Sequence, residues 1–326
     1  MPAFISCDWG SSALRLRLVD ADQLTILAEV MSNEGISRVF QTWQQQAKKE
    51  EDRLFYYRAI LVHQLGILRE KVNFALTDLP VIVSGMASSN LGMLELPYKD
   101  LPLSATGQDL YCTIIKATND FRHSILLISG VRTANDVMRG EETQLIGCLN
   151  GVSEADQLVI LPGTHSKHVV IKDGKVPNFK TYMTGEFFEL LTTKSMLSGV
   201  IEKKEDLMNA NDVSYFENAV ADSVHANLLH SSFLARTNYL FKTMSRQENY
   251  YYLSGLLIGT ELNEIVNSLI PVTVVSDGSL ATLYRIALQK LGVNDVKYQT
   301  ASEALINGQR KIFNLHYSKM IAANQR

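Results

Sequence analysis

Two short polar turns in this 326-residue sequence carry residue types that can bind the phosphates of a nucleotide. Asp8-Trp9-Gly10-Ser11-Ser12 follows one apolar run, and Pro162-Gly163-Thr164-His165-Ser166-Lys167 follows another. Glycine lets a backbone approach an anion closely, while backbone N–H groups and hydroxyls can donate hydrogen bonds to it. Lys167 adds a positive charge, and Asp8 is suited to hold magnesium through water. The two turns together predict phosphate binding, although either turn alone is also typical of an ordinary hairpin.

The familiar signatures of other nucleotide and hydrolase sites are missing from the chain. It has no Walker A pattern and no GxGxxG, HExxH or GxSxG string. Phosphoryl transfer needs backbone donors around the phosphates, magnesium, and a carboxylate that accepts the proton of the attacking hydroxyl. The two glycine turns are therefore the candidates for the donors, one in each half of the chain.

The same order of elements surrounds both turns: strand, turn, strand, turn, strand. Each triplet closes with a small polar group and glycine, Asn33-Glu34-Gly35 in the first and Met183-Thr184-Gly185 in the second. The pattern predicts a duplicated domain, although a chance likeness between two antiparallel meanders remains an alternative. The expected strands are residues 4–7, 14–18 and 24–31 in the first triplet and 157–161, 167–171 and 176–182 in the second.

Composition narrows the class of protein. With 46% hydrophobic residues, the chain is long enough for two domains that each bury a core. Its 31 Lys and Arg residues against 34 Asp and Glu residues, with no basic block, argue against a nucleic-acid partner. Three widely spaced cysteines indicate a reduced compartment. Without a signal-peptide pattern at its start or an apolar run of membrane-spanning length, the chain is expected to be cytoplasmic and free of the membrane. A homo-oligomer is left open.

Six strings in order along the chain resemble the 2-dehydro-3-deoxygalactonokinase family, within the actin-like ATPase superfamily of hexokinases and carbohydrate kinases. Together they cover nearly the whole chain. They are DWGSS (8–12), SGMASSNLGMLELPY (84–98), DVMRGEETQLIG (136–147), LPGTHSKHV (161–169), YMTGEFFELL (182–191) and SGLLIGTEL (254–262).

The resemblance implies an α/β fold of two similar actin-like ATPase (ribonuclease H-like) domains with a cleft between them. Residues 1–152 would carry the first phosphate loop and most of the sugar site. Residues 153–326 would carry the second loop and the adenosine site, with the option that the last helix packs back on the first domain. The implied reaction is ATP-dependent, magnesium-requiring phosphorylation of the terminal (C6) hydroxyl of 2-dehydro-3-deoxy-D-galactonate, giving the 6-phosphate and ADP in galactonate catabolism.

The resemblance also implies roles for individual residues. The catalytic carboxylate is expected after a glycine at the start of a helix, which points to Glu141 after Gly140, with Asp136 and Glu142 as alternatives and Asp8 as the magnesium residue. An acid at a helix start also stabilises the helix without any catalysis. The phosphate contacts would be Gly10, Ser11, Ser12, Gly163, Thr164, His165, Ser166 and Lys167, and the adenosine contacts Gly255, Gly259, Asp277, Gly278 and Ser279.

Substrate recognition is assigned to the loop that begins at Ser84, because its small polar residues suit sugar hydroxyls and a buried strand ends there. The substrate is a carboxylate, for which an arginine can supply paired hydrogen bonds. An ordinary surface loop is the alternative. The proposed contacts are Ser84, Gly85, Met86, Ser88, Asn90, Arg132 and Arg139.

The sequence departs from the family pattern in two places. His168 stands where an aromatic residue is common, and Leu91-Gly92-Met93 stands where Gln-Gly-Trp is common. The second change leaves a kinase for another small sugar, sugar acid or polyol as an alternative, and a non-catalytic ATP-binding switch as a further one. His165 and His168 lack a third metal ligand at suitable spacing, so hydrogen-bonding or packing roles are expected for them.

Overall fold

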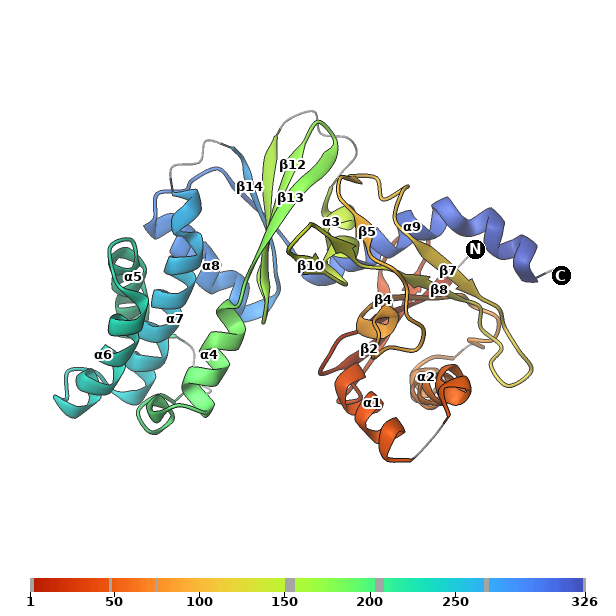
Figure 1. The fold of residues 1–326 in the computed structure, drawn as a ribbon, viewed down its shortest axis with the longest axis horizontal. Coiled ribbons are helices and arrows are strands. Elements are labelled where there is room, and N and C mark those ends of the chain that lie inside the picture. Colours follow the sequence, from red (N-terminus) through yellow and green to blue (C-terminus); the bar gives the residue numbers. More distant parts are fainter. Residues whose placement is uncertain are drawn as a thin grey trace. The chain divides into compact units, whose positions relative to one another are not determined.

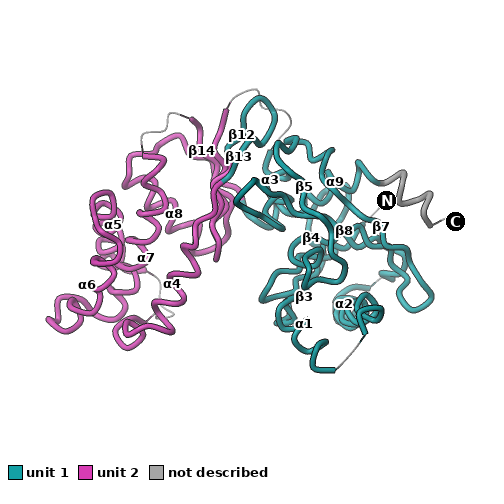
Figure 2. Tube along the Cα trace, in the orientation of Figure 1, with its two compact units in different colours: residues 1–155, 170–179, 300–326 teal, residues 156–169, 180–299 magenta. Residues whose placement is uncertain are grey.

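The computed structural model describes residues 3–46, 49–73, 75–149, 156–202, 208–266 and 270–324, with side chains up to residue 316. The chain divides into two compact units (Figure 2). Unit 1 contains residues 1–155, 170–179 and 300–326, and unit 2 contains residues 156–169 and 180–299. Each unit is built around a mixed β-sheet with helices packed on it (Figure 1).

The sheet of unit 1 has the strand order β3-β2-β1-β4-β8-β7. Strands β1, β2 and β3 form an antiparallel meander, and β4 and β8 continue the sheet parallel to β1. The central strands β1, β4 and β8 are mostly apolar and almost wholly buried, as expected for strands covered on both faces. The bounds are Ala3–Trp9 for β1, Leu14–Asp20 for β2, Ile26–Ser32 for β3, Val81–Gly85 for β4, Cys112–Ile115 for β7 and Ile125–Ile128 for β8.

Helices α1 (Ile36–Gln45) and α2 (Arg53–Glu70) belong to the core on one face of this sheet. Alternate residues of β1, from Ala3 to Trp9, pack with apolar residues that recur at helical spacing in α2, such as Leu61 and Leu65. A small sheet of β5 (Lys99–Asp100), β9 (Val131–Arg132) and β10 (Val137–Met138) lies apart from the main one.

Helices α3 (Glu141–Cys148) and α9 (Ala301–Asn324) touch each other with almost no space between their backbones. A Cβ atom added to Gly147 would lie 1.6 Å from the carbonyl oxygen of Ala304, and one added to Gly308 would lie 1.8 Å from that of Thr143. Only glycine fits at either point. The last helix of the chain is thereby held against the helix that begins at Glu141.

The second large sheet repeats the strand order of the first. It runs β15-β14-β11-β12-β13, which corresponds in chain order to β8-β4-β1-β2-β3. Strand β14 is parallel to both β11 and β15, and residues 170–179 of β12 and β13 are counted with unit 1. The same order twice is the arrangement of the actin-like ATPase fold, so the predicted fold class and duplication are confirmed. The bounds are Gln157–Leu161 for β11, Ser166–Lys172 for β12, Lys175–Tyr182 for β13, Val272–Val275 for β14 and Val296–Gln299 for β15; β6 (Leu103–Ser104) pairs with β13 within unit 1.

The helices of unit 2 are α4 (Thr184–Thr193), α5 (Ala210–Ser223), α6 (Leu228–Leu240), α7 (Arg246–Leu262) and α8 (Gly278–Lys290). Helices α5 and α6 are separated by a short break after Ser223. Asn227 begins a new helix there, because its side-chain oxygen accepts hydrogen bonds from the backbone N–H groups of Leu229 and His230.

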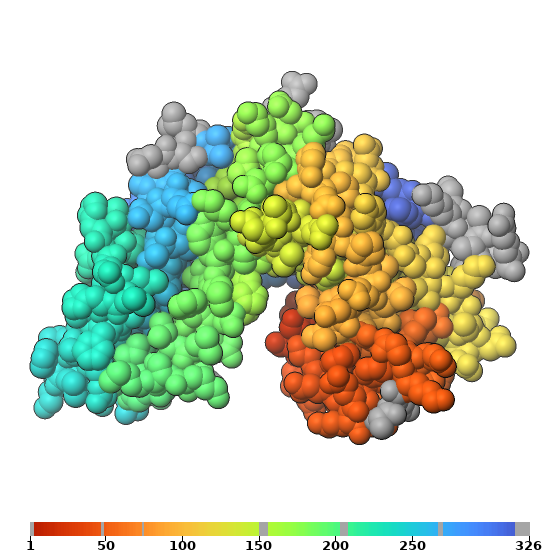
Figure 3. Space-filling view, viewed as in Figure 1, coloured from red at the N-terminus to blue at the C-terminus, as the bar shows by residue number. Residues whose placement is uncertain are grey.

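The green segment of α4 lies at the surface of unit 2 in Figure 3, and none of its ten residues is buried. Among the described residues, no helix combines the length and the apolar character needed to cross a bilayer.

Candidate active site

The turn after β1 is held in one shape by its own backbone and by the start of α1. The N–H of Gly10 donates to the carbonyl of Ala13 at 3.0 Å, and the carbonyl of Gly10 accepts from Ile36 at 2.9 Å. Gly35 lies so close that an added Cβ would be 2.3 Å from the carbonyl oxygen of Ser11. The side chains of Ser11 and Ser12 are exposed. The first predicted phosphate loop is thus preorganised and accessible.

Asp8 and Glu141 approach each other at the carboxyl ends of the central strands β1 and β4 of unit 1. Asp8 is the register neighbour of Ser84 on the parallel strand β4. At the next position, Gly85 has a φ of +94°, and a Cβ on Gly140 would lie 3.2 Å from its Cα. Burial raises the pKa of the Asp8 carboxyl; Arg17 and Arg15 oppose this rise, and Glu141 adds to it. The structure therefore brings two of the three predicted catalytic carboxylates together.

Glu142, an alternative to Glu141, is enclosed in the protein. Its carboxylate accepts hydrogen bonds from the N–H of Gly140 at 2.7 Å and from the hydroxyl of Thr143 at 3.1 Å, and its side chain is fully buried. Burial, with a smaller contribution from Glu141, raises the pKa of Glu142 to about 8. A residue with no exposed surface cannot reach a substrate hydroxyl, so Glu142 is a weaker candidate than Glu141.

The predicted sugar loop, residues 84–98, is clamped by side chains around it. Arg139 donates to both the carbonyl and the hydroxyl of Ser88 at 2.6 Å, and its guanidinium lies 4.0 Å from the centre of the Tyr98 ring. Arg53 donates to the carbonyl of Gly92 at 2.7 Å and to that of Asn90. Because its guanidinium is buried in these contacts, Arg139 supports the loop, and we no longer expect it to bind the substrate carboxylate.

The other residues predicted to bind the sugar differ in how far they are buried. Ser84 is fully buried, and its hydroxyl accepts a hydrogen bond of 2.9 Å from the amide of Gln309 in α9. Met86 is partly buried and Asn90 is exposed. The serine hydroxyls that the sequence suggested for sugar recognition therefore face the protein interior.

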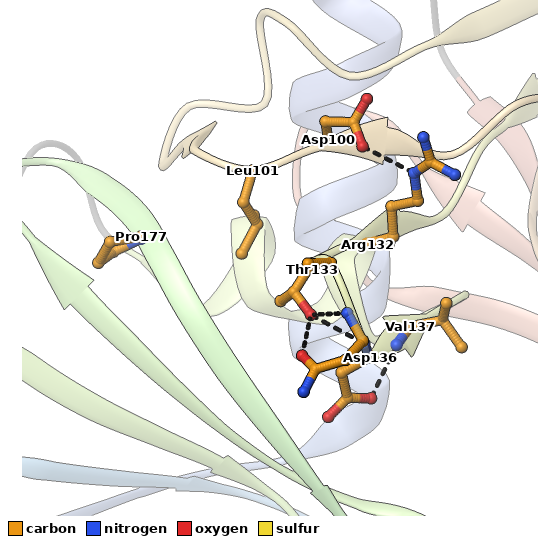
Figure 4. A pocket seen from close by; sticks show the side chains of 9 residues that line it. Asp100, Leu101, Arg132, Thr133, Asp136, Val137 and Pro177 are labelled. Atoms are coloured by element: carbon orange, nitrogen blue, oxygen red, sulfur yellow. Dashed lines mark hydrogen bonds and ion pairs between the residues drawn. The ribbon is translucent and has the colours of Figure 1, made fainter.

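A hollow of 740 Å³ in unit 1 contains Arg132 and Asp136 (Figure 4). Arg132 is exposed, and its Nε donates to Asp100 at 2.7 Å, while its other two guanidinium nitrogens make no hydrogen bond with the described residues. This contact lowers the pKa of Asp100. Asp136 lies on the turn between β9 and β10, where it accepts from the N–H of Val137. Asp136 thus shares the hollow with the accessible guanidinium of Arg132.

The second predicted phosphate loop follows β11 in unit 2. Gly163 is half-buried and Thr164 and His165 are exposed, whereas Ser166 and Lys167 are buried. The Lys167 ammonium donates to the carbonyl of His165 at 2.8 Å, and the Ser166 hydroxyl donates to Glu261 at 2.7 Å. The side chains of these two residues therefore support the loop from inside, contrary to the role expected of them.

A cavity of 130 Å³ in unit 2 opens beside this loop. Its walls come from the loop, from the start of α4 and from one side each of α7 and α8. Gly255 and Gly259 lie on another side of α7, where added Cβ atoms would meet Phe216 and Ser223 of α5 at 2.4 and 2.3 Å. These glycines permit close helix packing and do not line the cavity, so the adenosine role is withdrawn for them. The lining residues include Gly163, Thr184, Gly185, Ser254, Ser279 and Tyr284.

Comparison with known proteins decides the family. The model of the 2-keto-3-deoxy-galactonokinase family matches residues 8–312. The chain belongs to this family. A relative from Rhizobium meliloti (strain 1021) that carries the name 2-dehydro-3-deoxygalactonokinase is 32% identical over 317 residues, covering 94% of each chain. The 2-dehydro-3-deoxygalactonokinase of Escherichia coli (strain K12) is 29% identical over 312 residues, covering 92% of this chain and 95% of its own.

The fold of this galactonokinase family member agrees with a solved structure. The crystal structure of a Sinorhizobium meliloti protein named as a 2-dehydro-3-deoxygalactonokinase superposes with a TM-score of 0.79 at 30% identity, over 95% of this chain and 96% of that one. Members of the family are sugar kinases that use ATP. The predictions of the family, of a carbohydrate kinase and of ATP as co-substrate are confirmed.

Two residues that support this candidate site were not predicted from the sequence. Glu261 and Gln309 are both buried polar residues, at 2% and 0% exposure, and buried apolar residues lie three or four positions before and after each of them along the chain. Gln309 donates to the carbonyl of Cys7 as well as to Ser84, so it holds the ends of β1 and β4 next to Asp8. A lone polar residue on an apolar helix face is the signal that could have singled them out.

Proposed function

We propose that this chain transfers the γ-phosphoryl group of ATP to the C6 hydroxyl of 2-dehydro-3-deoxy-D-galactonate, as a step in galactonate catabolism. The products are the 6-phosphate and ADP, and the hydroxyl proton passes to a carboxylate. The match to the family over residues 8–312 carries the proposal. The carboxylates Asp8 and Glu141, brought together beside an accessible glycine turn, supply groups that this chemistry needs.

In this proposal Glu141 accepts the proton of the attacking hydroxyl. It is only partly buried and begins α3, where the N–H of Arg139 donates to its carboxylate at 3.1 Å. A carboxylate so oriented can receive a proton from a bound hydroxyl without a change of backbone. Asp136, in the hollow with Arg132, is the alternative base.

Unit 2 binds the nucleotide in this proposal. Backbone N–H groups of Gly163 and Thr164 contact the phosphates, and the 130 Å³ cavity takes the adenosine. Ser279 is in the first turn of α8 and lines that cavity, next to Gly278 and Asp277. A helix start offers unpaired N–H groups to polar ligand atoms, which favours this position.

Magnesium fits the chain as a partner of ATP. No group of three or more metal-ligating side chains occurs among the residues the structure describes, so the phosphates would supply most ligands. Magnesium commonly binds in this way, with one or two carboxylates and several waters. Asp8 is the suited carboxylate, because its pKa is raised by burial and by Glu141, and a cation would offset both effects. The ion supplies charge neutralisation to the transferring phosphoryl group.

Asp8→Asn is expected to lower turnover with magnesium-ATP by about 10- to 100-fold, the usual effect of losing a residue that holds a metal through water. The fold should persist, because the amide keeps the size of the carboxylate. Coupled ADP release at increasing magnesium concentration measures the effect, and partial recovery at high magnesium is expected. Unchanged activity would remove Asp8 from the mechanism.

Arg132 is proposed to bind the substrate carboxylate, since it lines the hollow and two of its guanidinium nitrogens make no hydrogen bond with the described residues. Arg132→Gln should raise the KM for the sugar acid by about 10- to 100-fold, the equivalent of one or two charge-assisted hydrogen bonds. The KM for ATP should stay constant. Equal KM values for the sugar acid in the wild type and in Arg132→Gln would mean that another residue binds the substrate carboxylate.

Coupled ADP release against a panel tests the function itself: 2-dehydro-3-deoxygalactonate, its gluconate epimer, galactonate, glycerol and glucose. A strong preference for the first is expected. Activity on another compound of the panel would mean that the chain is a kinase for a different substrate. Slow ATP hydrolysis that no sugar stimulates would favour a nucleotide switch. The cytoplasmic location and the homo-oligomer stay predictions.

A further inference from the structure

One buried carboxylate in unit 2 contacts four polar side chains from three other elements. Glu261, in α7, is 2% exposed. Its Oε1 lies 2.7 Å from the Ser166 hydroxyl and 2.9 Å from Nε2 of His168. Its Oε2 accepts from the Tyr284 hydroxyl at 2.7 Å and from the Thr184 hydroxyl. Each oxygen thus has two partners, which matches the capacity of an ionised carboxylate.

The partners of Glu261 are placed next to the second predicted phosphate loop. Ser166 is the first residue of β12, directly after Gly163, Thr164 and His165. Thr184 is the first residue of α4, and Tyr284 lines the 130 Å³ cavity together with it. Glu261 therefore connects the end of the loop with two walls of the cavity.

The start of α4 also contacts the second predicted phosphate loop. The N–H of Glu186 donates to the carbonyl of Thr164 at 3.0 Å, and the Glu186 carboxylate lies 2.6 Å from the His165 ring. A Cβ on Gly185 would come within 2.6 Å of the Gly163 carbonyl oxygen. The loop is therefore flanked by Ser166 and by the start of α4. Glu261 accepts hydrogen bonds from both, through the hydroxyls of Ser166 and Thr184.

The burial of Glu261 makes this arrangement sensitive to small changes. A charge in the protein interior is tolerated only when hydrogen bonds replace the water it has lost. Burial, and after it the Glu261 charge, raises the pKa of Tyr284, which keeps that hydroxyl a donor. Any change that removes a donor or the charge should shift the remaining partners, the loop included.

We infer that Glu261 is a positioning residue for nucleotide binding: its carboxylate sets the second phosphate loop and the cavity walls in one fixed arrangement. The inference rests on the proposed function in that the loop and cavity bind ATP. It predicts that weakening the hydrogen bonds of this carboxylate lowers the affinity for the nucleotide and leaves the affinity for the sugar acid unchanged.

Glu261→Gln tests the inference, because it keeps the shape and replaces one oxygen by an NH₂ group that faces two donors. The dissociation constant of magnesium-ADP, measured by calorimetry, should rise about tenfold, and so should the KM for ATP, as expected for one lost charge-assisted hydrogen bond. The KM for the sugar acid should change less than about twofold.

Asp212→Asn is the matched control. Asp212 is another fully buried carboxylate of unit 2. It accepts from the N–H of Asn209 at 3.0 Å and from Gln247 at 2.7 Å, and it makes no hydrogen bond with the described residues of the loop. The Asp212→Asn variant should lower the melting temperature as Glu261→Gln does, without weakening ADP binding. Equal ADP affinities in the two variants at equal loss of stability would overturn the inference.

Two milder variants cover the case in which Glu261→Gln does not fold. Tyr284→Phe and Thr184→Val each remove one donor, and each should weaken ADP binding about threefold; wild-type affinity in both would also overturn the inference. ADP binding by the wild type without sugar-acid turnover would reject the proposed reaction alone, since the affinity comparison does not need catalysis.

Discussion

Glu141→Gln is expected to lower kcat by about 10²- to 10⁴-fold, the range for loss of a general base. The amide keeps the size of the side chain and can still accept the hydrogen bond that the N–H of Arg139 donates, so the start of α3 should stay in place. It cannot take a proton from the substrate hydroxyl. The KM for ATP should change little, because Glu141 is proposed to act on the sugar acid. Steady-state kinetics with both substrates varied measures the split.

Glu142→Gln is the matched control for this experiment, since it makes the same change one residue later. Glu142 is fully buried and its oxygens are occupied by Gly140 and Thr143, so kcat should stay within about threefold of wild type. Asp136→Asn examines the alternative base. If Asp136→Asn abolishes turnover while Glu141→Gln retains it, the role of base moves to Asp136.

Gly308→Ala is expected to destabilise unit 1 by about 3 kcal/mol, at the upper end for overpacking. Its new methyl group would lie 1.8 Å from the Thr143 carbonyl oxygen, so α3 and α9 must separate. The contact is with backbone, which cannot turn aside as a side chain can. Activity should fall as well, because α9 carries Gln309, whose amide holds Cys7 and Ser84 beside Asp8. Thermal unfolding and urea unfolding measure the loss.

Gly66→Ala provides the contrast within the same unit. Gly66 lies inside α2, and an added Cβ would meet nothing within 4 Å. Alanine should therefore stabilise the helix by about 0.5 to 1 kcal/mol. A melting temperature for Gly308→Ala that matches this variant would mean that α3 and α9 do not pack as described.

The amino-acid sequence by itself determined the fold and the family. The alternation and apolar runs of two strand triplets, each interrupted by a glycine turn, predicted the meanders that the structure contains. Strand periodicity is a local property, and motifs that follow one another in a fixed order can be recognised without knowledge of contacts. The start of α3 at Glu141 was also local, because a glycine followed by acidic residues is a helix-start signal.

Only the tertiary structure decided which polar side chains face a ligand and which support the site from within. Ser88, Arg139, Ser166 and Lys167 were expected to bind substrate or phosphate, yet all four are buried and bonded to protein groups. Residue type and spacing show that a group can donate a hydrogen bond, but not to which partner. The partner depends on residues distant in sequence, as Ser166 and Glu261 are, and folding must satisfy each buried polar group.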